Sequence, residues 1–66
     1  MTYHILAVFP EGSYKVAESN CPDHGMDVAE KVCKAIDRFP HAFVTFIPGK
    51  HKYNGNIFSL CDLKKR

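Results

Sequence analysis

The stretch CPDHG, residues 21–25, holds the residue types most able to do chemistry. Cys21 and His24 have the spacing of half a zinc site, and His4 and His51 could supply the remaining ligands. One Cys-x-x-His pair is a much weaker indication than two CxxC motifs, and structural zinc sites usually need four protein ligands. We therefore expect no bound metal, no cofactor, and a fold that persists in chelator.

The same stretch could instead bind an anion or simply begin a helix. Free backbone N–H groups at a helix start would face an anion, with Lys50 and Lys52 beside it. In the structural alternative, which we favour, Pro22 ends a strand, Asp23 caps the helix and Gly25 relaxes the turn. Nucleophilic catalysis needs an orienting third group and a pocket, and a short chain leaves little room for one. The sequence therefore predicts that the protein is not an enzyme.

Hydrophobic periodicity predicts the elements that position these residues. The segments 2–9 and 14–19 alternate like strands around the turn PEGS and predict a hairpin. Residues 27–39 follow a helical period, with one apolar face formed by Ala29, Val32, Cys33, Ile36 and Phe39. Segments 41–47 and 56–63 read as two more strands, and Asn54-Gly55 favours a tight reversal between them. We expect an α+β fold of order β-β-α-β-β, a single domain over 1–66 in which a four-stranded antiparallel sheet carries one helix on one face.

Alternating strand directions would gather the polar residues at one end of such a domain. The start of the first strand, the start of the helix and the last loop would meet there. The candidate binding residues at this end are Lys50, His51, Lys52, Tyr53, His24 and Tyr3. The opposite end would hold Glu11, Arg38, His41, Lys64, Lys65 and Arg66.

Counting faces predicts self-association. One helix covers one side of a four-stranded sheet, and the last two strands carry large apolar side chains on both sides. An apolar face with no cover suggests a homodimer at micromolar concentration, formed through the uncovered sheet face. On the covered face, Ile36→Ala should cost about 2–4 kcal/mol of stability.

Composition narrows the setting. Residues 50–66 carry five basic and one acidic side chain, whereas residues 1–49 carry four basic and six acidic ones, so the positive charge lies in the last quarter of the chain. Three cysteines without a signal peptide favour a reducing, cytoplasmic location, and no apolar run approaches the length of a membrane span.

The layout of the chain resembles the very small accessory proteins carried by bacteriophages and mobile elements. The residues that carry this resemblance are Val16, Ala17, Glu18 and Ser19, with Ala29, Glu30 and Lys31. Such proteins commonly bind and block a host factor, as anti-CRISPR and other anti-defence proteins do, and some sequester nucleotide signals. The resemblance therefore implies a non-catalytic binding protein acting on a host protein or an anionic nucleotide-type ligand, in the host cytoplasm. The alternative is a nucleic-acid or nucleotide-binding module that uses the basic 50–53 loop and the basic C-terminus.

Overall fold

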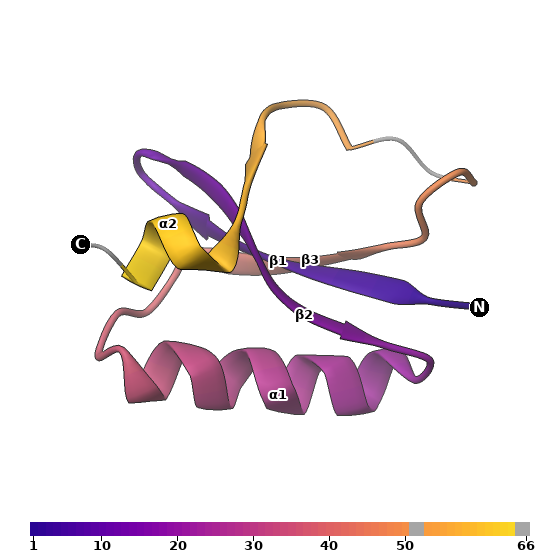
Figure 1. The fold of residues 1–66 in the computed structure, drawn as a ribbon, viewed down its shortest axis with the longest axis horizontal. Coiled ribbons are helices and arrows are strands. Elements are labelled where there is room, and N and C mark those ends of the chain that lie inside the picture. The colour runs from indigo at the N-terminus through magenta and orange to yellow at the C-terminus, as the bar shows by residue number, and fades with distance from the viewer. Residues whose placement is uncertain (51–52, 65–66) are drawn as a thin grey trace.

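The computed structural model describes residues 1–50 and 53–64 and has an α+β fold, as expected (Figure 1). The elements in chain order are β1 (Tyr3–Phe9), β2 (Gly12–Ser19), α1 (Pro22–Ala35), β3 (Ala42–Phe46), β4 (Ile57–Phe58) and α2 (Leu60–Lys64). No helix within the described ranges is long and apolar enough to cross a membrane.

The predicted hairpin is confirmed, because β1 and β2 pair antiparallel from Tyr3↔Ser19 to Phe9↔Gly12. Gly12 has a φ of 152°, which favours glycine, and a Cβ there would lie 2.7 Å from the ring of Phe58. The pairing shifts between Ile5 and Leu6, whose partners are Ala17 and Lys15. Val16 is therefore an extra residue in β2, a β-bulge.

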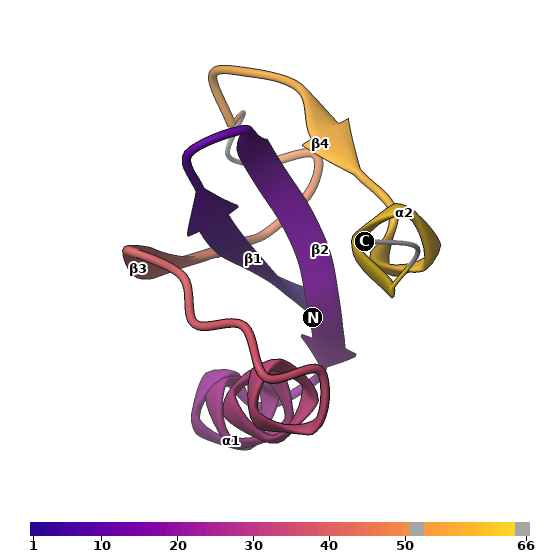
Figure 2. The ribbon, with the colours of Figure 1, turned by 90° about the vertical axis from the view of Figure 1, so that its left-hand side faces the viewer.

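The sheet is mixed, so the prediction of a fully antiparallel sheet is wrong. Its strand order is β3-β1-β2-β4, and Figure 2 shows the strands side by side in this sequence. β3 pairs antiparallel with β1, whereas β4 pairs parallel with β2. The connection after β3 passes to the opposite edge of the sheet before β4 begins, so the tight reversal expected at Asn54-Gly55 does not pair the last two strands.

The last predicted strand, 56–63, is mostly wrong as well, because only Ile57 and Phe58 pair and the chain then turns into α2. The Ser59 Oγ donates to Asp62 Oδ2 at 3.1 Å, and the Asp62 N–H donates to the Ser59 carbonyl at 3.1 Å. Both bonds join residues three apart and close the first turn of a helix in place of a longer strand.

Helix α1 begins five residues before the predicted start and ends four residues before the predicted end. Its N-cap is Cys21, with Pro22 in the first turn, where a missing N–H costs nothing, so the assignment of Asp23 as the cap is wrong. It stops at Ala35 because Asp37 adopts a left-handed φ of 56° and the Arg38 N–H bonds back to the Cys33 carbonyl at 3.1 Å.

The main core lies between the sheet and α1. Side chains alternate along β1, so Ile5, Ala7 and Phe9 point towards α1. They pack in one cluster with the buried helix residues Ala29 and Cys33. α1 approaches β1 closely at Gly25, where a Cβ would lie 2.9 Å from Ile5 Cγ1. The short helix α2 adds Leu63, which is 1% exposed, to the same core cluster.

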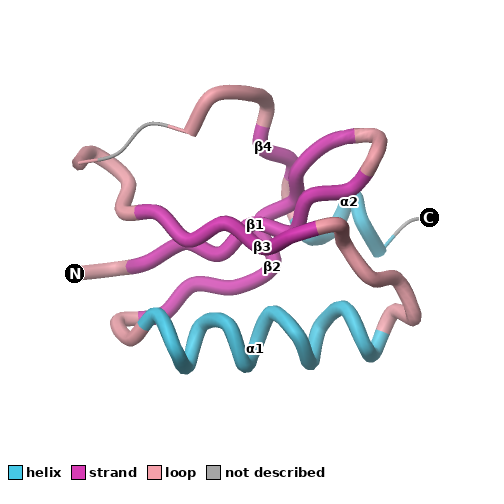
Figure 3. Tube along the Cα trace, turned by 180° about the vertical axis from the view of Figure 1, so that it is seen from behind, coloured by secondary structure: helices cyan, strands magenta, loops and turns pink. Residues whose placement is uncertain are grey.

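The sheet face away from α1 is covered in part by the chain itself. The expectation of a bare apolar sheet face, from which a homodimer was predicted, is therefore wrong in its premise. Figure 3 shows the described parts of the connection between β3 and β4, residues 47–50 and 53–56, on the side away from α1. Tyr53 from this connection packs on Phe46, with ring centroids 6.3 Å apart, and its hydroxyl lies 2.6 Å from Ser13 Oγ. Beneath this layer Leu6 is fully buried. The sheet therefore has chain on both sides.

Candidate functional site

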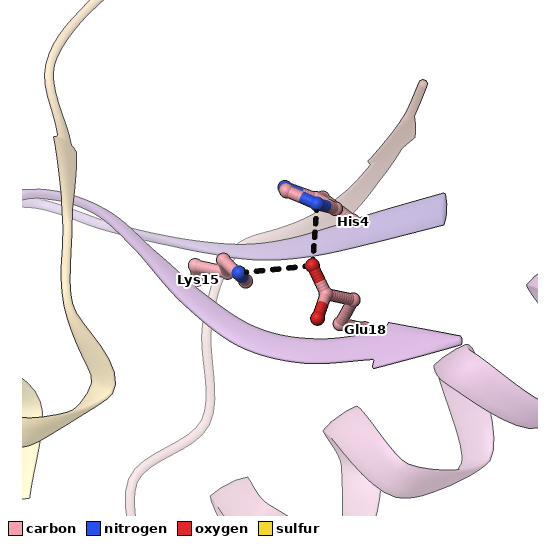
Figure 4. A network of polar contacts seen from close by, with 3 residues as sticks. All are labelled: His4, Lys15 and Glu18. Carbon is pink, nitrogen blue, oxygen red and sulfur yellow. Dashed lines mark hydrogen bonds and ion pairs between the residues drawn. The ribbon is translucent and has the colours of Figure 1, made fainter. Parts of the chain in front are cut away.

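A polar network lies on the sheet face away from α1 (Figure 4). His4 Nε2 lies 2.7 Å from Glu18 Oε1, and Lys15 Nζ lies 3.2 Å from the same oxygen. His4 and Glu18 are direct cross-strand partners in β1 and β2. These three side chains thus converge from two neighbouring strands.

The β-bulge at Val16 brings Lys15 into this network. In a regular strand, residues three apart point to opposite faces of the sheet, so Lys15 and Glu18 would be separated by it. The extra residue resets the alternation, and both side chains then point away from α1.

The network has a defined electrostatic state. The hydrogen bond and charge of Lys15 lower the pKa of the Glu18 carboxyl, and His4 adds a smaller contribution in the same direction. Glu18 is therefore an anion at neutral pH. The His4 ring also packs edge to face with Phe46, with centroids 5.4 Å apart.

An open depression lies beside the network, with a volume of about 530 Å³. This is within the range of about 300–1,000 Å³ typical of small-ligand sites. Its lining residues are Met1, Thr2, His4, Glu18, Ile47, Pro48 and Lys50. The depression thus combines an apolar wall with a charged rim.

Lys50 is the surplus charge of this depression. Its only side-chain hydrogen bond within residues 1–50 and 53–64 is to Met1 Sδ, at 3.8 Å, and no described carboxylate pairs with it. The positive charge of Lys15 neutralises the negative charge of Glu18, with which it forms an ion pair. The charge of Lys50 then leaves these three side chains with a net charge of +1. We call the depression, with His4, Lys15, Glu18 and Lys50, the charged depression.

The structure divides the residues expected to form a binding site. Lys50 lines the charged depression, whereas Tyr53 is half-buried against Phe46 and Ser13 and supports the fold. Tyr3 and His24 lie on the α1 side of the sheet. Tyr3 is two residues before Ile5 in β1 and therefore shares its face, and His24 lies in the first turn of α1. His51 and Lys52 lie outside the described residues.

The described cysteines and histidines do not gather. No group of three His, Cys, Asp or Glu side chains close enough to hold a metal occurs in the described part of the chain. Cys21 and Cys61 are exposed and Cys33 is buried, where desolvation raises the pKa of its thiol. That the purified protein carries no stoichiometric zinc stays a prediction.

A second charged contact, at the hairpin end, ties the segment that follows α1 to the β1–β2 turn. Arg38 Nη1 lies 2.9 Å from Glu11 Oε2 at an angle that makes no hydrogen bond, while Nη2 donates to Oε1 at 3.2 Å. The guanidinium also stacks over Phe9, 4.5 Å from the ring centroid. These contacts explain Arg38 as a structural residue.

Comparison with protein-family models, with curated proteins and with solved structures found no match. The assignment of a function therefore depends on the chemistry of the charged depression.

Proposed function

We propose that the chain is a non-catalytic binding protein that captures a small anionic ligand in the charged depression. The observation that carries the proposal is Lys50, whose ammonium lines the depression without a described carboxylate partner. A phosphate group is the fitting ligand chemistry, because it would replace water around this unpaired cation with a charge-assisted hydrogen bond.

The other walls suit the rest of such a ligand. Met1, Ile47 and Pro48 offer apolar surface next to Lys50, and the His4 imidazole adds a polar ring at the rim. A nucleoside phosphate has this combination of a flat, weakly polar base and a charged tail. The ligand class we propose is therefore a nucleotide.

Binding fits the network better than catalysis does. A general base works best when its pKa is near the operating pH, and the bond from Lys15 moves the pKa of Glu18 the wrong way. A hydroxyl nucleophile would need a hydrogen bond to a base such as His4. Thr2 is the residue with a hydroxyl among those that line the depression, and no hydrogen bond joins it to His4 among the described residues. Glu18 instead holds His4 and Lys15 in place as part of a fixed rim.

This proposal agrees with the resemblance to small phage accessory proteins. A protein of this kind would act in the host cytoplasm by removing a nucleotide signal from the host factor that uses it.

Calorimetric titration tests the proposal. Adenosine diphosphate and pyrophosphate are the probes, each at about 50 mM and about 200 mM salt, because phosphate contacts weaken as salt rises. Lys50→Ala should lower the affinity for both probes roughly ten- to a hundredfold, the effect of one charged hydrogen bond. Lys31→Ala is the matched control, since it removes an equal charge from the exposed face of α1.

Equal affinity of the Lys50→Ala and Lys31→Ala proteins would contradict the proposal, as would no heat with either probe. A single-stranded oligonucleotide that binds far more tightly than adenosine diphosphate, with a steeper salt dependence, would instead favour the nucleic-acid alternative.

A further inference from the structure

The two edges of the sheet are built differently. At one edge β4 is only two residues long, and α2 then packs against β2, with Ser59 and Leu60 beside residues 15–18. At the other edge β3 offers five residues, and no described strand pairs with its outer side. One edge strand is only two residues long and leads into a helix, whereas the other is five residues long and open.

Strand β3 also lacks the features that normally prevent edge pairing. Natural edge strands carry Lys, Pro, inward charges or bulges that discourage a second strand. The sequence of β3 is AFVTF, without a charge, a proline or a bulge in its pairing with β1. Its outer backbone N–H and C=O groups are therefore open to another strand.

A groove runs beside this edge on the α1 side, with a volume of about 420 Å³. Its lining residues are Glu30, Cys33, Lys34, Phe39 and Phe43. Phe39 is 70% exposed, the highest fraction among the described large hydrophobic residues. An exposed aromatic next to an open edge is the expected composition of an interface core.

We propose that β3 pairs antiparallel with β3 of a second copy of this chain, around a two-fold axis at Val44, to make a continuous eight-stranded sheet. In this register Ala42 lies opposite Phe46 of the second copy, and Phe43 lies opposite Thr45. Each aromatic therefore meets a small or β-branched residue, which is a favourable cross-strand pair, and no charges of like sign oppose one another.

The helices lie on the same side of this arrangement. The two-fold places the α1 helices of the two copies antiparallel on one face of the joined sheet. Both Glu30 and Lys34 line the groove of each copy, so neither copy brings a charge of single sign to this face that would repel the other. Phe39 lines the groove beside the edge that joins the copies, and pairing reduces its exposure.

This interface differs from the sheet face that the sequence suggested and is smaller. Five paired residues and one aromatic per copy bury less than the roughly 1,200–2,000 Å² of a stable interface, so we expect dissociation in the micromolar range. Ligand capture in the charged depression does not depend on this dimer, because the depression lies on the other face of the sheet.

Sedimentation equilibrium over a range of concentrations tests the dimer. Wild-type protein should approach the dimer mass at roughly hundreds of micromolar. Thr45→Lys should stay monomeric. Thr45 is exposed, and in the proposed register it is a diagonal cross-strand neighbour of Thr45 in the second copy, so the two lysines would repel each other. Asn56→Lys, which adds an equal charge next to β4 at the opposite edge, should dimerise like the wild type.

Phe39→Ala provides a second test that leaves the core intact, because Phe39 is exposed; it should weaken the dimer at least roughly threefold, as an interface aromatic does. A wild-type protein that stays monomeric at the highest concentration would overturn the proposal. A folded Thr45→Lys protein, or a Phe39→Ala protein, that dimerises as strongly as the wild type would also overturn it.

Discussion

The β-bulge at Val16 determines at the residue scale which side chains meet. It places Lys15 on the same face as Glu18, where the two form an ion pair of 3.2 Å, and Glu18 reaches His4 at 2.7 Å. Without the extra residue Lys15 would point into the core side, where a lone charge is costly. The charged depression thus depends on one irregular residue in an otherwise regular hairpin.

The three cysteines should differ sharply in reactivity. Cys33 is 1% exposed and burial raises the pKa of its thiol, so it forms little of the reactive thiolate, whereas Cys21 and Cys61 are exposed. Iodoacetamide at mildly alkaline pH should add two groups to the native protein and three to the denatured protein, by intact mass. Modification of all three at one rate in native conditions would show that α1 does not cover Cys33.

At the scale of elements, the end of the chain departs most from what its pattern suggests. Residues 56–63 alternate well enough for a strand, but the chain turns into α2 at Leu60, with hydrogen bonds between Ser59 and Asp62 across the first turn. This S-x-x-D spacing is visible in the sequence and could have predicted the helix start. What it could not predict is that Leu63 would reach the core shared by β2 and α1.

Two substitutions measure what each helix contributes. Leu63→Ala should lower the free energy of unfolding by about 2–5 kcal/mol, because Leu63 is 1% exposed and leaves a cavity. Ile36→Ala should lower it by about 1–2 kcal/mol, less than its place in the sequence pattern suggests, because Ile36 is the half-buried C-cap of α1. Urea denaturation gives both values, and a larger loss at Ile36 than at Leu63 would mean that α2 is not part of the core.

At the scale of the whole molecule, local pattern predicted the elements better than their arrangement. The hairpin and the amphipathic helix follow from short-range periodicity and are confirmed, with shifted helix ends. The sheet order depends on where the chain after β3 crosses, and no local residue encodes a crossover. The same holds for the site: the charge of Lys50 is visible in the sequence, but its position beside the His4–Glu18 pair depends on that crossing and on the bulge.

Chemical-shift mapping tests the central claim, capture of an anionic ligand in the charged depression, most directly. Adenosine diphosphate should be added stepwise to ¹⁵N-labelled protein while the backbone amide shifts are followed. The account predicts saturating shifts at His4, Glu18, Ile47 and Lys50, with none at His24 in the first turn of α1. Saturating shifts confined to the start of α1, or no saturable shift at all, would contradict it.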